Sequence, residues 1–165
     1  MKNKKILLII VFAFILLFTG CGKSIKDELD DNNQNLTGTS GVKSERTASG
    51  MAHWAENAYM ERWDYSWGSA SNGEVDNSGL IFSYVGGGSR TSEEMLSNSS
   101  ESGPISSIPD IPGMGVYMNG HVGVYVGGGM VIDARNEEEG IVRSSISSTP
   151  WNLWFEIPGI EYDNK

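Results

Sequence analysis

Three kinds of hydrophobic pattern follow one another along the chain. An unbroken apolar run covers residues 6–18, apolar residues recur at helical spacing in 51–63 and 80–85, and apolar and polar residues alternate in short runs across 116–157. Residues 22–49 contain almost no large apolar residue and cannot build a core, which predicts a flexible tether. Helical segments followed by a run of strands predict an α+β domain over about residues 50–162.

The first helix is predicted from about Met51 to Trp63, with Ser49 as its N-cap. The positions expected to face the core are Met51, Trp54, Ala55, Ala58, Tyr59 and Trp63. His53 lies at the start of this helix, without an acidic or nucleophilic neighbour of known geometry. We interpret it as a surface or cap histidine.

A second, short helix is predicted to begin within the stretch Val75-Asp76-Asn77-Ser78-Gly79-Leu80 and to continue to about Val85. The start of a helix has free backbone N–H groups and the positive end of the helix dipole, so it favours a cysteine thiolate. Position 77 carries asparagine instead. The glycines at 86–88 lack the lysine and hydroxyl residue of a phosphate-binding loop, which indicates a helix stop.

Residues 89–110 are predicted to make a long surface excursion, with one helical turn near 92–96. The C-terminal part predicts an antiparallel sheet with two hairpins. The first hairpin turns at Asn119-Gly120, and the second turns at three glycines after Val126. A further strand at 141–145 and a segment at 151–157 complete the expected sheet.

The register of the second hairpin follows from its apolar residues. Pairing Val126 with Met130 places Val124 opposite Ile132 and Val122 opposite Ala134, which makes one side wholly apolar. The opposite side then holds His121, Gly123, Tyr125, Val131, Asp133 and Arg135. His121 and Asp133 become diagonal neighbours, roughly 7–8 Å apart at Cα.

Such a pair has the chemistry of the base and the orienting residue in a nucleophile–base–orienter triad. The alternative is a partly buried sheet histidine beside a solvent-facing acid.

The N-terminus has the features of a targeting signal. Three lysines precede the apolar run, which is too short for a good membrane span and has the length of a signal-peptide core. The run ends in Phe18-Thr19-Gly20-Cys21, which resembles the lipobox of bacterial lipoproteins. We expect residues 1–20 to be removed, Cys21 to carry diacylglycerol, and residues 21–49 to tether an extracytoplasmic domain to the cell membrane. The alternative is an ordinary secretory signal.

Composition narrows the chemistry further. Cys21 is the only cysteine, so its lipidation would leave no thiol for catalysis, a disulfide or a metal site. Removal of residues 1–20 takes away three lysines and no acidic residue, and the formal charge moves from −9 to −12. A chain with this much negative charge is a poor partner for nucleic acid.

The acidic residues at 27–31 lack the spacing of a calcium-binding hand, and we expect neither a metal nor a cofactor.

Four motifs follow one another along the chain. They are Tyr65-Ser66-Trp67-Gly68, Asp76-Asn77-Ser78-Gly79-Leu80, Gly115-Val116-Tyr117 and His121-Val122-Gly123-Val124-Tyr125-Val126-Gly127. Their order and spacing resemble the NlpC/P60 family of papain-like cell-wall cysteine peptidases. The resemblance covers about residues 50–162. It implies a nucleophile-carrying helix packed on a small antiparallel sheet, and hydrolysis of amide bonds in peptidoglycan stem peptides through an acyl-enzyme.

The resemblance also implies roles for individual residues. His121 would be the general base and Asp133 the orienting residue. Tyr65 would line the substrate side. Asp76 and Ser78 would flank the nucleophile within the substrate-binding region. Asn77 occupies the position of the cysteine, and its amide is neither acidic nor nucleophilic.

Three hypotheses about function follow. The domain could bind stem peptides without cleaving them, it could be a hydrolase that uses Ser78 or another nucleophile, or it could be a surface module that binds an unidentified protein. Ser78 is disfavoured as a nucleophile because the next residue of a helix points about 100° away.

Overall fold

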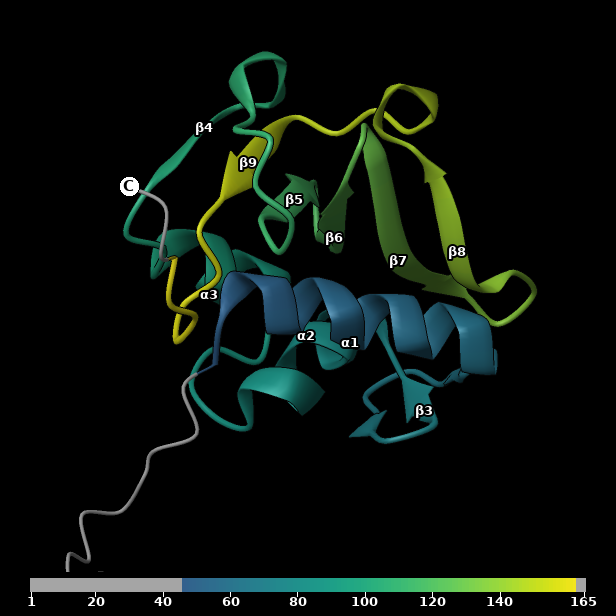
Figure 1. Cartoon of the computed structure of the whole chain (residues 1–165). Coiled ribbons are helices and arrows are strands. Elements are labelled where there is room, and N and C mark those ends of the chain that lie inside the picture. The colour runs from purple at the N-terminus through teal and green to yellow at the C-terminus, as the bar shows by residue number, and fades with distance from the viewer. Residues whose placement is uncertain (1–45, 163–165) are drawn as a thin grey trace, which may run out of the picture. The chain divides into compact units, whose positions relative to one another are not determined.

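Two helices, α1 (Ala48–Glu61) and α2 (Asn77–Val85), pack against one face of an antiparallel sheet (Figure 1). The computed structural model describes residues 46–162. The predicted signal peptide, the predicted lipidation site Cys21 and the predicted tether up to residue 45 lie outside the described residues. Within the described range the α+β class is confirmed, and no helix there is both long and apolar enough to cross a membrane.

The start of α1 differs from the prediction. Thr47, not Ser49, is the N-cap, and its Oγ1 accepts a hydrogen bond from the Gly50 backbone N–H at 3.1 Å. Thr47 also bridges to Glu161 near the C-terminal end, so residues 46–49 belong to the folded domain rather than to the tether. Tyr59 is 40% exposed, which contradicts its predicted core position.

The predicted α2 is confirmed, and Gly86 ends it in the left-handed conformation at φ 70°. The helical turn expected near residue 92 is α3 (Ser92–Ser97), which begins with a capping box between Thr91 and Glu94. The same excursion contains two elements that the sequence did not indicate, β4 (Ser102–Pro104) and a short 3-10 helix, η1 (Ile105–Ser107).

The main sheet has six strands in the order β4-β9-β5-β6-β7-β8. Its other strands are β5 (Gly115–Met118), β6 (His121–Gly127), β7 (Met130–Asn136), β8 (Gly140–Ser145) and β9 (Leu153–Phe155). The second 3-10 helix, η2 (Ile146–Ser148), lies between β8 and β9. Both predicted hairpins are present, because Met118 pairs with His121 across the Asn119-Gly120 turn and β6 pairs with β7.

The predicted register of the second hairpin is confirmed in its centre, where Val124 pairs with Ile132. At the glycine turn it is wrong: Gly127, not Val126, pairs with Met130, after a register shift. Gly127, Gly128 and Gly129 all have positive φ, so the turn takes up a backbone conformation that favours glycine.

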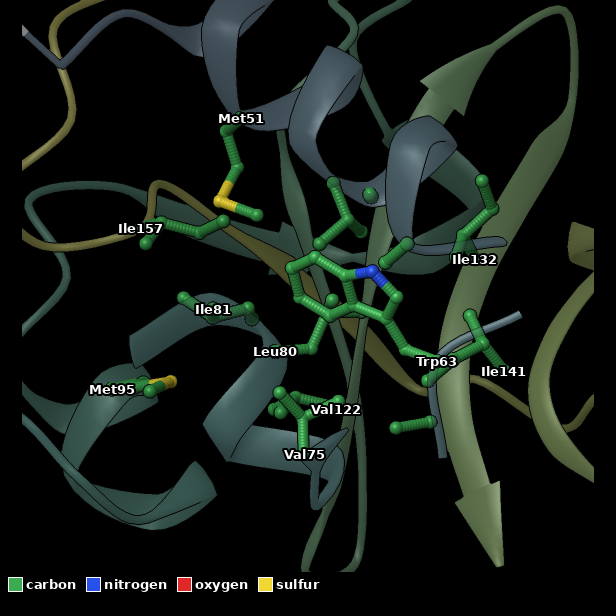
Figure 2. Close-up of a cluster of buried hydrophobic side chains, with 14 of the residues drawn as sticks. Met51, Trp63, Val75, Leu80, Ile81, Met95, Val122, Ile132, Ile141 and Ile157 are labelled. Carbon is green, nitrogen blue, oxygen red and sulfur yellow. The ribbon is translucent and has the colours of Figure 1, made fainter. Parts of the chain in front are cut away.

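Both faces of this hairpin are buried. The apolar face contacts α1 and α2 in the cluster shown in Figure 2, where Trp63 lies among Leu80, Val122 and Ile132. The other face packs in a second cluster that contains Tyr125, Trp151 and Trp154. Asp133 is therefore fully buried, which excludes the solvent-facing acid that the sequence left open.

A small second sheet lies between α1 and α2 in the chain. Its strands are β1 (Asp64–Tyr65), β2 (Ala70–Ser71) and β3 (Glu74–Val75), in the order β1-β3-β2. The amide of Asp76 donates to the Ser69 carbonyl at 2.9 Å, so this sheet is joined directly to the start of α2.

Candidate active site

Asn77 is the first residue of α2, and Asp76 is the N-cap of this helix. The Asp76 side chain holds the segment that enters α2 in place. The Asp76 Oδ1 accepts from the Gly79 amide, and Oδ2 accepts from the Gly68 amide at 2.9 Å. The first bond satisfies a helix-start N–H group, and the second holds the 66–69 turn against the helix. The Asn77 side chain is half-buried and reaches the turn between β5 and β6.

The Asn77 amide faces His121. Its Nδ2 lies 3.2 Å from His121 Nδ1 and 3.4 Å from the Gly120 carbonyl oxygen. The backbone N–H of Ser78 donates to Asn77 Oδ1, so the Nδ2 end of the amide points at the His121 ring. Because Nδ2 is only a donor, this contact requires His121 Nδ1 to act as the acceptor.

The other ring nitrogen of His121 contacts Asp133. His121 Nε2 lies 2.9 Å from Asp133 Oδ2, the contact that the hairpin register predicted. Asp133 also accepts two bonds from Arg135, from Nε to Oδ2 at 3.2 Å and from Nη2 to Oδ1 at 3.0 Å. The carboxylate is thus paired with a cation, and the His121 Nε2–H donates to it.

Trp151 covers the imidazole. The two ring centroids are 5.6 Å apart with an interplanar angle of 17°, and Trp151 is 5% exposed. No sequence pattern indicated this contact, because Trp151 lies in the loop before β9, distant in the chain from His121. The stacked indole restricts the ring to the plane that joins position 77 to Asp133.

Asp76 and Ser78 are buried beneath the site rather than exposed on it. Arg90 pairs with the Asp76 carboxylate at 2.9 and 3.1 Å and donates to Ser78 Oγ at 2.6 Å. Ser78 Oγ in turn lies 3.2 Å from Asp76 Oδ1. These contacts assign both side chains to support of the helix start, and a direct contact with substrate stays a prediction. Ser78 is engaged by Arg90, not by His121.

Tyr65 lies in β1, partly buried against the core. Burial, with the nearby carboxylates of Asp76 and Glu137, raises the pKa of its hydroxyl. It therefore stays a neutral hydrogen-bonding group at physiological pH. Tyr65 also lines a cavity of about 670 Å³ between the end of α1 and the β7–β8 turn.

A large aromatic residue is exposed in the turn that is held against the start of α2. Trp67, in the turn after β1, is 81% exposed. His53 is exposed on α1, as predicted. Within residues 46–162, no group of three or more His, Cys, Asp or Glu side chains is placed to hold a metal ion.

The close contact between α2 and the small sheet predicts a strict requirement for glycine at position 79. A Cβ added there would lie 2.0 Å from the Ser69 carbonyl oxygen and 2.8 Å from Asp76 Oδ1. Gly79→Ala should lower the free energy of unfolding by about 2 kcal/mol, because backbone has to move. Urea denaturation measures this loss.

Gly87→Ala is the matched control, because a Cβ at Gly87 meets nothing within 4 Å and its φ is not positive. Equal stability of the two alanine variants would contradict the close contact at Gly79.

A helix-start residue that faces a sheet histidine, which is itself oriented by a carboxylate, is the arrangement of papain-like peptidases. The fold and this site place the chain in that class. The NlpC/P60 family model matches residues 62–157, more than half of the chain, and the chain belongs to this family.

Solved structures agree on the fold. NlpC2 from Trichomonas vaginalis has 18% identity and a TM-score of 0.56, covering 71% of this chain and 48% of that protein. NlpC1 from the same organism has 17% identity and a TM-score of 0.55, covering 67% and 43%. The peptidoglycan hydrolase RipB from Mycobacterium tuberculosis has 20% identity and a TM-score of 0.52, covering 70% and 67%.

The chain thus spans less than half the length of the two Trichomonas proteins. None of the curated proteins compared with the chain matches it.

Proposed function

We propose that this protein is a lipid-anchored, extracytoplasmic member of the NlpC/P60 family that binds peptidoglycan stem peptides without hydrolysing them. The observation that carries this proposal is Asn77, whose amide lies 3.2 Å from the base His121 where the family has its nucleophile. His121 cannot activate an amide by removing a proton, so no acyl-enzyme can form. The remaining side chains are still arranged around position 77.

The ligand class follows from the family, whose activity is directed at stem peptides. RipB, which shares the fold, is described as a peptidoglycan hydrolase. Partly buried Tyr65, beside a cavity and close to the start of α2, is suited to hydrogen-bond a peptide in this region. The lipid anchor rests on the Phe18–Cys21 sequence, which would hold the domain at the outer side of the membrane next to the cell wall.

A protein-binding surface module is the second candidate. Trp67 and Met60 are 81% and 65% exposed, and large exposed apolar side chains are common at protein interfaces. In that case binding would not depend on the residues around position 77. A hydrolase that uses Ser78 has less support, because Arg90 holds that hydroxyl inside the domain.

The first prediction of this proposal concerns binding. The chain from residue 22 onward should bind soluble peptidoglycan fragments saturably and release no peptide product. Calorimetry measures the binding, and chromatography with mass spectrometry measures the products. Tyr65→Ala and His121→Ala should weaken binding, whereas His53→Ala, at an exposed position of α1, should not.

Product release by the natural sequence that is lost in Ser78→Ala would favour the hydrolase. Capture of a protein partner that persists in Tyr65→Ala and His121→Ala would favour the surface module.

A further inference from the structure

The Asp133 carboxylate is shared between His121 and Arg135, and this sharing has a chemical consequence for the imidazole. We propose that Arg135 is a positioning residue that neutralises the buried carboxylate and so keeps His121 Nδ1 without a proton, facing position 77. The inference rests on the proposed function, because it concerns the same site. Its test does not require the protein to bind or cleave peptidoglycan.

The position of Arg135 in the strand explains how it reaches the carboxylate. Asp133 and Arg135 are two residues apart in β7, so their side chains point to the same face of the sheet. A register shift between Ala134 and Asn136 places Arg135 at an irregularity of the β7–β8 pairing. Bulges of this kind redirect side chains next to active sites.

The guanidinium is held in place by further contacts. Arg135 Nη1 donates to Glu139 at 3.2 Å, and Nη2 lies 3.4 Å from Ser144 Oγ and 3.5 Å from Thr149 Oγ1. The Thr149 carbonyl accepts from the Trp151 amide at 2.8 Å. Arg135 therefore binds the Asp133 carboxylate that contacts the imidazole. Through Thr149 it is also connected to the segment that carries the stacked Trp151 indole.

Burial makes the charge of Arg135 decisive. Asp133 is 0% exposed, and an ionised carboxylate at such a site requires a cation or a proton. The other side chains that contact the imidazole, Asn77 and Trp151, carry no charge. With Arg135 present, the carboxylate is compensated and the imidazole can remain neutral, with its single proton on Nε2.

Without the guanidinium, the buried site favours uptake of a proton. A proton on Asp133 Oδ1, the oxygen that Arg135 Nη2 contacts, would leave the ring unchanged, and this outcome contradicts the proposal. The proton has two other places to reside. It can convert His121 into an imidazolium, which puts a proton on Nδ1. It can instead reside on Asp133, which then donates to Nε2, so that the single proton of the imidazole moves to Nδ1. Both routes leave Nδ1 protonated. The lone pair that accepts the Asn77 amide, and that would accept the proton of a thiol at position 77, is then lost.

Nitrogen NMR of the imidazoles tests this directly. The chain has two histidines, so 15N-histidine labelling of the full-length protein in mild detergent gives two rings, and exposed His53 is an internal reference. At pH 7, His121 should show an unprotonated Nδ1 and a protonated Nε2. In Arg135→Gln, the Nδ1 signal should move to the range of a protonated ring nitrogen, while the His53 signals stay unchanged.

Two further variants separate charge from structure. Arg135→Lys keeps the cation and should retain an unprotonated Nδ1, and it is the variant to use if Arg135→Gln does not fold. Arg143→Gln removes a cation from the neighbouring strand, where Arg143 pairs with Glu56, and should leave His121 unchanged. A folded Arg135→Gln with the parental His121 signals, or an Arg135→Lys with a protonated Nδ1, would overturn the proposal.

The result is distinguishable from failure of the proposed function. If the natural chain binds no peptidoglycan, the proposed function fails, but the signals of the His121 ring still report whether Arg135 controls its proton. If the chain binds peptidoglycan and the His121 signals are the same in Arg135→Gln as in the parental chain, only the positioning role fails.

Discussion

Replacing Asn77 by cysteine should produce hydrolysis of peptidoglycan peptides, whereas the chain with Asn77 should produce none. The new Sγ would lie at the start of α2, beside free backbone N–H groups and close to His121 Nδ1, which accepts a hydrogen bond in the natural chain. Removing a nucleophile that acts together with its base abolishes nearly all of the chemical step, so the gain should be on the order of 10⁴-fold or more. Release of peptides from purified cell wall measures it.

The controls use the same position and the same base. Asn77→Ala should remain without activity, and His121→Ala combined with Asn77→Cys should lose most of the gain. When the chain starts at residue 22, Cys21 is absent, so alkylation reports only on the introduced thiol. A folded variant with an accessible thiol that cleaves no wall material would contradict the inherited active site.

The parts of this site that follow from sequence are those fixed by strand alternation. Pairing β6 with β7 to give one apolar face leaves a single register, and that register brings His121 to Asp133. The turn before His121 also follows from local sequence, because Asn119-Gly120 favours a two-residue hairpin turn. The family motifs add the expectation that position 77 faces this pair, and the 3.2 Å contact between Asn77 and His121 has that geometry.

Other parts depend on contacts between segments that are distant in the chain. Arg90 lies in a polar stretch with no periodicity, and only the folded chain brings it to Asp76. Trp151 stacks on His121 from a loop before β9. The two-residue strands of the small sheet are too short for an alternation signal and are held by tertiary contacts such as the Asp76–Ser69 bond.

Arg135 is an intermediate case. Its place two residues after Asp133 puts it on the same face of the strand, so its proximity was predictable. Its role was not, because it depends on the complete burial of Asp133. That burial results from Trp151 and Trp154 packing on the second face of the hairpin, a layer that the local pattern does not reveal.

The pair between Arg90 and Asp76 supports the second large prediction, a loss of stability in Arg90→Met. Asp76 is 7% exposed and uses its carboxylate to hold two backbone amides, while Arg90 compensates its charge and lies 5.6 Å from the Phe82 ring centroid. Without the guanidinium, an ionised carboxylate stays buried without a cation at the start of α2. The free energy of unfolding should fall by about 3 kcal/mol, which urea denaturation measures.

Three comparisons identify the cause of that loss. Asp76→Asn keeps an N-cap side chain and leaves the partly exposed Arg90 in contact with solvent, so it should cost only about 1 kcal/mol. Adding Asp76→Asn to Arg90→Met should then recover part of the loss, because no buried charge remains. Arg143→Met, which breaks the solvent-exposed pair with Glu56, should change stability by about 0.5 kcal/mol or less. If Arg90→Met is as mild as Arg143→Met, Asp76 does not depend on Arg90, and the start of α2 is held by its backbone bonds alone.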